Sequence, residues 1–224
     1  MQSSRQKYPR TPHLTWSQGV AADDKIIENL NGFIGQRVIV TEKMDGESFT
    51  GYADGYCHAR SLDSRTHTSR DWVKNFWATI CADIPQDWRV CGENLYAKHS
   101  IAYDDLQSYF MGFSIWNERN ECLDWDATQE WFDLLGITSV PVLYDGIWDA
   151  NLIQGLYDVR RNYHTHEGYV VRTAAGFSYG EFRKRVAKFV RADHVATTAH
   201  WMHGQQIIPN KLKVYMDADI IKQD

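Results

Sequence analysis

The residues best suited to covalent chemistry are the consecutive Glu42-Lys43-Met44-Asp45-Gly46, which follow the apolar run Val38-Ile39-Val40. A lysine amine acts as a covalent nucleophile when its site activates it and holds the target close. At its ordinary pKa the amine is protonated and inert, and nearby carboxylates favour that form. The acidic residues around Lys43 therefore make chemical sense only beside cations, either basic side chains or a divalent metal. Alone, the pattern K-x-D-G also fits an ordinary surface turn.

Four further blocks follow this one in order. They are Gly92-Glu93-Asn94-Leu95-Tyr96, Met111-Gly112-Phe113-Ser114-Ile115, Glu167-Gly168-Tyr169-Val170-Val171-Arg172 and Val186-Ala187-Lys188-Phe189-Val190-Arg191. Singly they are weak, since Phe113 also fits a core strand and Glu93 an ion pair. Together, from Arg37 to about Arg191, the five blocks resemble the covalent nucleotidyltransferase superfamily of ATP-dependent ligases and mRNA capping enzymes. Within it the chain looks most like the RNA ligase 2-like branch of ATP-dependent RNA ligases.

The resemblance implies an enzyme that joins 5′-phosphate and 3′-hydroxyl ends of RNA through a lysyl-AMP intermediate and an adenylylated 5′ end. ATP would donate the AMP, and Mg²⁺ or Mn²⁺ would assist. The implied catalytic residues are Lys43 as nucleophile, Asp45, Glu167 as the acid associated with the metal, and Lys188 on phosphate. The implied cofactor-binding residues are Lys43 and Lys188 again, with Glu42 at the adenine edge, Arg60 on nucleotide and nucleic-acid end, Glu93 on the ribose and Phe113 stacked on adenine.

The last block departs from the pattern of the superfamily, which has two lysines separated by one residue. Val190 stands in the second place, and Lys184, two strand periods before Lys188, is the alternative on the same face. Other interpretations also stay open. They are a small ATP-dependent DNA or mixed-substrate nick ligase, a guanylyltransferase, and a non-catalytic module that binds nucleotide or RNA.

Histidines offer a second kind of metal site. His164-x-His166 flanks Glu167, but the metals of ligases prefer oxygen ligands. His194 and the later His200 and His203 are expected at the surface or in capping roles. Lys98 and His99 are candidate phosphate contacts without a firm assignment.

Composition limits the class of protein. The net charge of −5 argues against coating nucleic acid with the whole surface, although a local basic groove is compatible with it. The four cysteines contain no C-x-x-C pair, and no apolar run is long enough for a signal peptide or a membrane span. We expect a cytoplasmic or nucleoplasmic protein that is not secreted and has no membrane partner.

The expected fold is α+β, a nucleotidyltransferase domain of antiparallel sheets flanked by helices without an OB domain. We expect an irregular lead-in over 1–15, the adenylation domain over 16–192 and a short helical tail over 193–224. Expected helices include 23–30, 69–81, 124–135 and 150–160. The short tail also predicts either a weak grip on nucleic acid or a partner protein that supplies the missing surface.

Overall fold

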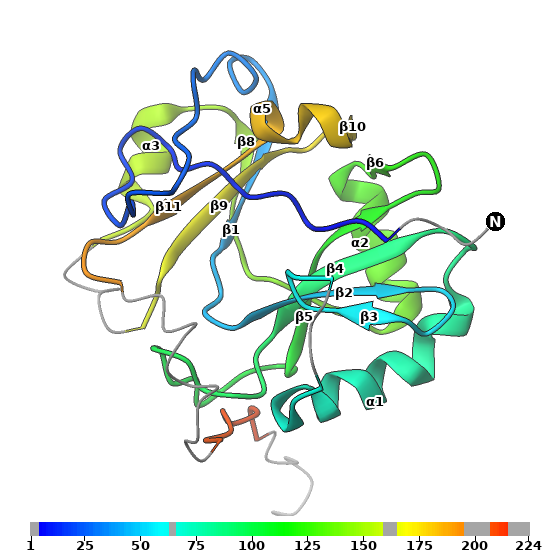
Figure 1. Ribbon diagram of the computed structural model, residues 1–224. Coiled ribbons are helices and arrows are strands. Elements are labelled where there is room, and N and C mark those ends of the chain that lie inside the picture. The colour runs from blue at the N-terminus through cyan, green and yellow to red at the C-terminus, as the bar shows by residue number, and fades with distance from the viewer. Residues whose placement is uncertain (1–4, 63–65, 159–164, 195–206, 215–224) are drawn as a thin grey trace, which may run out of the picture.

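The computed structural model describes residues 5–62, 66–158, 165–194 and 207–214, which form two largely antiparallel sheets (Figure 1). The smaller sheet has the order β11 (Val186–Val190), β9 (Gly168–Thr173), β1 (Arg37–Glu42) and β8 (Val142–Ile147). The larger has the order β10 (Phe177–Ser178), β6 (Glu121–Cys122), β5 (Phe110–Trp116), β4 (Arg89–Asn94), β2 (Glu47–Tyr52) and β3 (Cys57–His58), and β7 (Thr138–Ser139) pairs with β5. The α+β fold class is confirmed, and the described strands form open sheets.

Two helices cover one face of the larger sheet. α1 (Asp71–Ile80) and α2 (Trp125–Leu135) contribute Trp77 and Phe132 to an apolar cluster with Phe49 of β2 and Phe110 of β5. α2 ends at Gly136, which has a φ of 64°, as its sequence predicts. The opposite face of the larger sheet is thereby left for the smaller sheet.

The smaller sheet is also covered on its outer face. Val40 of β1, Val171 of β9 and Phe189 of β11 pack there with the N-terminal segment and with α3 (Ala150–Gly155). Side chains alternate along a strand, so their neighbours face inward. The inward residues are Thr41, Val170, Arg172, Val186 and Lys188, all of which line a cavity. Period-two alternation in three strands thus builds one wall of the site.

Short helical turns complete the chain. They are η1 (Thr68–Arg70), η2 (Cys81–Asp83), η3 (Tyr179–Glu181) and α5 (Phe182–Arg185). None of the described helices is long and apolar enough to cross a membrane.

The helix predicted over 23–30 is wrong, because this segment forms turns and a bridge. His13 N donates to the carbonyl of Lys25 and Ile27 N donates to the carbonyl of His13, at 2.6 and 2.8 Å. These long-range bonds occupy backbone groups that a helix would need. Of the predicted helical tail, residues 207–214 run as extended chain beside the loop around Ala97 and Leu106, and 195–206 and 215–224 lie outside the described residues.

Candidate active site

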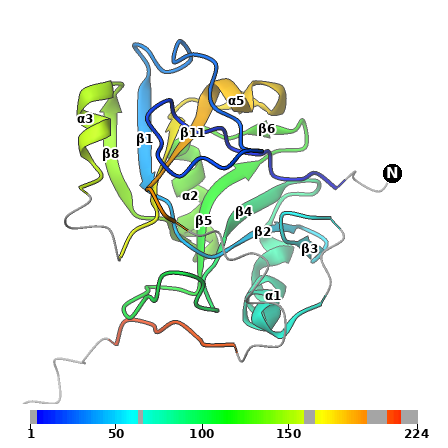
Figure 2. The same ribbon diagram turned by 60° about the vertical axis from the view of Figure 1, so that its left-hand side comes forward.

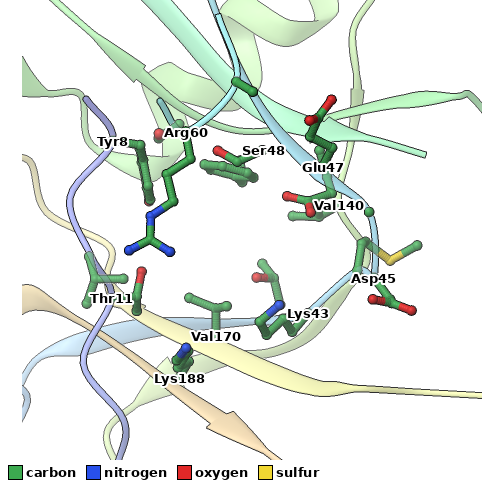
Figure 3. A pocket seen from close by; sticks show the side chains of 18 of the residues that line it. Tyr8, Thr11, Lys43, Asp45, Glu47, Ser48, Arg60, Val140, Val170 and Lys188 are labelled. Carbon is green, nitrogen blue, oxygen red and sulfur yellow. The ribbon is translucent and has the colours of Figure 1, made fainter. Parts of the chain in front are cut away.

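A cavity of about 740 Å³ lies between the two sheets and the N-terminal segment. Figure 3 shows Lys43, Val170 and Lys188 along one wall and Glu47, Ser48 and Arg60 along the other. Every predicted site residue lines this cavity. They are Glu42, Lys43, Asp45, Arg60, Glu93, Phe113, Glu167 and Lys188.

Lys43 directly follows β1, on the inward face that Thr41 also occupies. Its Nζ donates a hydrogen bond of 2.6 Å to Oε2 of Glu167, and its side chain is 24% exposed. Burial works to lower the pKa of Lys43, but the carboxylates of Glu167 and Glu93 outweigh it and hold that pKa above its ordinary value. The amine is therefore protonated at neutral pH in this state, and additional positive charge nearby is needed to free its lone pair.

Glu167 immediately precedes β9, and Gly168 explains its position. A Cβ on Gly168 would lie 2.0 Å from the carbonyl oxygen of Phe189, so only glycine lets β9 approach β11 so closely. Arg191 N–H also donates to the carbonyl of Glu167 at 3.0 Å. The backbone position of Glu167 is thus fixed by its connection to β9 and by a hydrogen bond from the residue that follows β11.

Asp45 lies in the connection between the sheets and is held by three donors. Its Oδ2 accepts bonds of 2.8 and 2.9 Å from N–H and Oγ of Ser100, and one of 2.7 Å from Ile101 N–H. Burial alone would raise the pKa of Asp45, but hydrogen bonds from His194, Ile101 and Ser100 hold it at about 2. This carboxylate is therefore ionised at neutral pH.

The pKa of Glu93 on β4 shifts in the opposite direction to that of Asp45. Burial, together with the charges of Glu167, Asp45 and Glu47, raises the pKa of Glu93 to about 8, although Lys43 opposes this. Its neighbour Glu47 is neutralised by a two-pronged ion pair with Arg70. The cavity therefore concentrates acids, and a bound divalent cation would reduce their mutual repulsion.

A β-bulge aims Phe113 into the cavity. In the pairing of β4 with β5, Cys91 faces Ser114 and Gly92 faces Gly112, so Phe113 is the extra residue. Phe113 and Ser114 consequently both line the cavity, although regular alternation would separate them. The ring of Phe113 meets that of Tyr8 edge-on, at 5.1 Å between centroids.

The remaining predicted residues lie at the cavity rim or deeper in it. Arg60 is exposed on the loop after β3 and points across the cavity (Figure 3). Burial, then the nearby charge of Lys43, lowers the pKa of Lys188 from its ordinary value. Glu42 Oε1 lies 3.6 Å from Nε2 of His166, and burial, with a smaller contribution from Asp105, raises the pKa of Glu42 to about 7.

Two predictions, one for Lys184 and one for His194, need correction. Lys184 belongs to α5 rather than to a strand, is exposed and does not line the cavity, so it does not share the face of Lys188. His194 is neither a surface nor a capping residue. Its side chain is 4% exposed and it lies in the cavity beside Asp45 and Glu167. No local pattern marks His194, because its position depends on the turn after β11.

Neither Lys98 nor the other described histidines belong to the group formed by Asp45, Glu167 and His194. His99 lines the cavity, whereas Lys98 is exposed outside it. His166 contacts Glu42 rather than a metal cluster. The predicted partners His164, His200 and His203 lie outside the described residues.

The comparison with solved structures first defines the fold, which is similar to that of RNA ligases. A mutant of Naegleria gruberi RNA ligase with ATP and Mn aligns with a TM-score of 0.54 and 18% identity, over 83% of this chain and 58% of that chain. The same ligase with PPi aligns with a TM-score of 0.51 and 19% identity, over 84% and 59%. This chain thus spans less than two thirds of the ligases it matches.

The comparison of the sequence with protein families agrees with the comparison of structures. The RNA ligase family matches residues 36–190, most of the chain, and the protein therefore belongs to this family. The matched segment is nearly the span over which the five blocks resemble RNA ligases. No curated protein matches the sequence.

Proposed function

We propose that this protein is an ATP-dependent RNA ligase that forms a covalent lysyl-AMP at Lys43. The observation that carries the proposal is the position of Lys43 Nζ, which lies in the cavity and is hydrogen-bonded to Glu167. Glu93 and Asp45 also lie close enough to raise the pKa of this amine. Membership of the RNA ligase family supports the same chemistry.

In the first step Lys43 Nζ releases its ammonium proton to solvent and its lone pair attacks the α-phosphorus of ATP. An N–P bond forms, the P–O bond to pyrophosphate breaks, and the nitrogen gives up a second proton to solvent. Phosphoryl transfer depends mainly on positioning and charge neutralisation. Glu167 orients Nζ, and Lys188 adds a basic side chain to the same wall. The oxygens of Asp45 and Glu167 suit a divalent metal, which would neutralise phosphate and favour the neutral amine of Lys43. AMP then moves to a 5′-phosphate, and a 3′-hydroxyl displaces it.

The cavity offers a distinct environment for each part of ATP. Phe113 and Val170 line the cavity from opposite sheets and would present apolar surface to the adenine, and Glu42 also lines the cavity. Glu93 on β4 also lines the cavity and would bind the ribose hydroxyls, as the resemblance to RNA ligases implies. Arg60 points into the cavity from the wall opposite Lys43 and Lys188 (Figure 3), from where it would contact the phosphates.

Autoadenylylation tests the proposal directly. Purified protein is stripped with pyrophosphate, then mixed with α-labelled ATP and Mg²⁺ or Mn²⁺, and covalent label is measured. We expect label on the wild type and none on Lys43→Ala. Lys184→Ala, an exposed lysine outside the cavity, is the matched control and should label normally. A wild type that binds ATP without covalent label, with either metal, would identify a non-catalytic module instead.

The label should then be chased by 5′-phosphorylated RNA. A nick with RNA on its 3′-hydroxyl strand should be sealed faster than the same nick made of DNA, whereas equal rates would favour the mixed-substrate alternative. A partner protein that extends the RNA-binding surface and a cytoplasmic or nucleoplasmic location stay predictions from the sequence.

A further inference from the structure

His194 is brought back toward the cavity by the turn that follows β11. Arg191 N–H is bonded to the carbonyl of Glu167, and Asp193 has a φ of 56°, so the chain reverses its direction just past the strand. The imidazole thereby reaches the two carboxylates that flank Lys43. Its Nε2 lies 3.3 Å from Oε1 of Glu167 and 3.6 Å from Oδ1 of Asp45.

Each carboxylate uses one oxygen for positioning and presents the other to His194. Asp45 Oδ2 is occupied by Ser100 and Ile101, which leaves Oδ1 directed at the imidazole. Glu167 Oε2 holds Lys43, which leaves Oε1. Such outer contacts are typical of metal ligands, whose orientation they fix.

The spacing suits one metal ion. The donor atoms of Asp45, Glu167 and His194 all lie within 4.8 Å of one another. Ligands bound at about 2.1 Å on neighbouring coordination positions lie roughly 3.0–3.4 Å apart. The two measured separations from Nε2 are therefore close to what a shared ion requires.

Apolar packing does not explain why the side chain of His194 is buried at this place. The side chains of Asp45, Glu167 and His194 are 9%, 7% and 4% exposed, so all three are removed from water. His194 Nδ1 has no hydrogen-bond partner among the described residues, although buried polar atoms are normally paired. Apart from the two carboxylates, no described neighbour holds the ring in place through a polar contact.

We infer that His194 is a direct ligand of the divalent metal, completing a mixed site of one imidazole nitrogen and two carboxylate oxygens with Asp45 and Glu167. Mg²⁺ takes oxygen ligands and retains its waters, whereas a mixed nitrogen–oxygen set favours transition metals. The site therefore prefers Mn²⁺ to Mg²⁺. The inference deepens the proposed function and rests on it only for the catalytic use of the metal.

Metal binding by the full chain, without ATP or RNA, tests the inference. Mn²⁺ binding is measured by electron paramagnetic resonance, with Mg²⁺ as competitor, and pulsed measurements detect nitrogen bound to Mn²⁺. We expect the nitrogen signal in the wild type and its loss in His194→Ala. Mn²⁺ affinity should fall about tenfold or more, and Mg²⁺ affinity by less than about threefold.

Two further variants serve as controls for the metal-binding measurement. His99→Ala, a cavity histidine outside the cluster, should keep the nitrogen signal. His194→Gln repeats the test with a larger side chain, and thermal unfolding with each variant checks that the fold is retained. Unchanged Mn²⁺ affinity in folded His194 variants, or no nitrogen signal in the wild type, overturns the inference.

The test also separates this inference from the proposed function. Nitrogen-ligated Mn²⁺ in a wild type that forms no adenylate would refute the ligase activity alone. Adenylate formation combined with unaltered Mn²⁺ binding in His194→Ala would refute the metal ligand alone.

Discussion

At the scale of the residue, short motifs predict the acids and bases of the cavity because most of these residues lie in a strand or directly beside one that the same motif defines. Lys43 follows β1 and Glu167 precedes β9, so a buried apolar run fixes both positions. His194 has no such strand beside it. Its place depends on the turn at Asp193 and on contacts with residues far away in sequence, which no local pattern encodes.

Glu42 provides a pH-dependent test at this scale. Burial raises the pKa of Glu42 from its ordinary 4.5 to about 7, and its side chain is only 11% exposed. Between these values the unfolded chain releases a proton that the folded protein keeps. The free energy of unfolding should therefore fall with rising pH, by about 1.4 kcal/mol per pH unit and at most about 3 kcal/mol in total.

Glu42→Gln removes this ionisation. We expect the variant to lose that slope between pH 4.5 and 7 and to be more stable than the wild type at pH 8, by about 1–3 kcal/mol. Urea unfolding at a series of pH values measures both quantities. Glu28→Gln, at an exposed glutamate, should follow the wild type. Parallel curves for the wild type and Glu42→Gln would show that Glu42 is ionised in the folded protein.

At the scale of the element, the sequence predicts the sheets well because alternation and turn residues are local signals. The hairpin at Asp54-Gly55 and the cap and stop of α2 follow from them. The bulge at Phe113 is different, since it arises from the register between β4 and β5. The position of Lys184 is also not a local signal, because the turn of α5 interrupts the strand alternation that would place it on the face of Lys188.

Gly168 tests the packing of β9 on β11. In Gly168→Ala the new Cβ meets the backbone of Phe189, which cannot move without breaking the sheet. We expect a loss of about 2–4 kcal/mol of stability and a Tm lower by at least about 4 °C. Gly155→Ala is the matched control, because nothing lies within 4 Å of its Cβ in α3. That variant should be neutral or slightly stabilised, and equal melting of the two variants would contradict the close approach.

At the scale of the whole molecule, the segment predicted as a lead-in contacts both sheets, as Figures 1 and 2 show. Arg5 lies over the rings of Tyr52 and Tyr56 in the β2–β3 region, at 4.5 and 4.4 Å. Leu14 N donates to the carbonyl of Lys188 on β11 at 2.7 Å, and Leu14 is fully buried. The segment is irregular, yet its long-range contacts close one side of the cavity.

Tyr8 is the residue through which this closure can be tested. Its ring contacts Phe113 of the larger sheet and Phe182 of α5 edge-on, at 5.1 and 5.2 Å between centroids. Such pairs contribute about 0.5–1.5 kcal/mol each beyond burial. Tyr8→Ala should therefore lower the free energy of unfolding by about 2–3 kcal/mol, and it should weaken ATP binding because Phe113 loses the ring that fixes its orientation.

Tyr8→Phe separates the contributions of ring and hydroxyl, since it keeps both edge-on contacts. We expect it to bind ATP like the wild type in calorimetric titration and to unfold within about 1 kcal/mol of it. If Tyr8→Ala lowers stability but leaves the ATP affinity unchanged, the segment holds the sheets together without shaping the nucleotide pocket. If neither quantity changes, the closure of the cavity does not depend on Tyr8, and the sheets are held in place by their own strand connections.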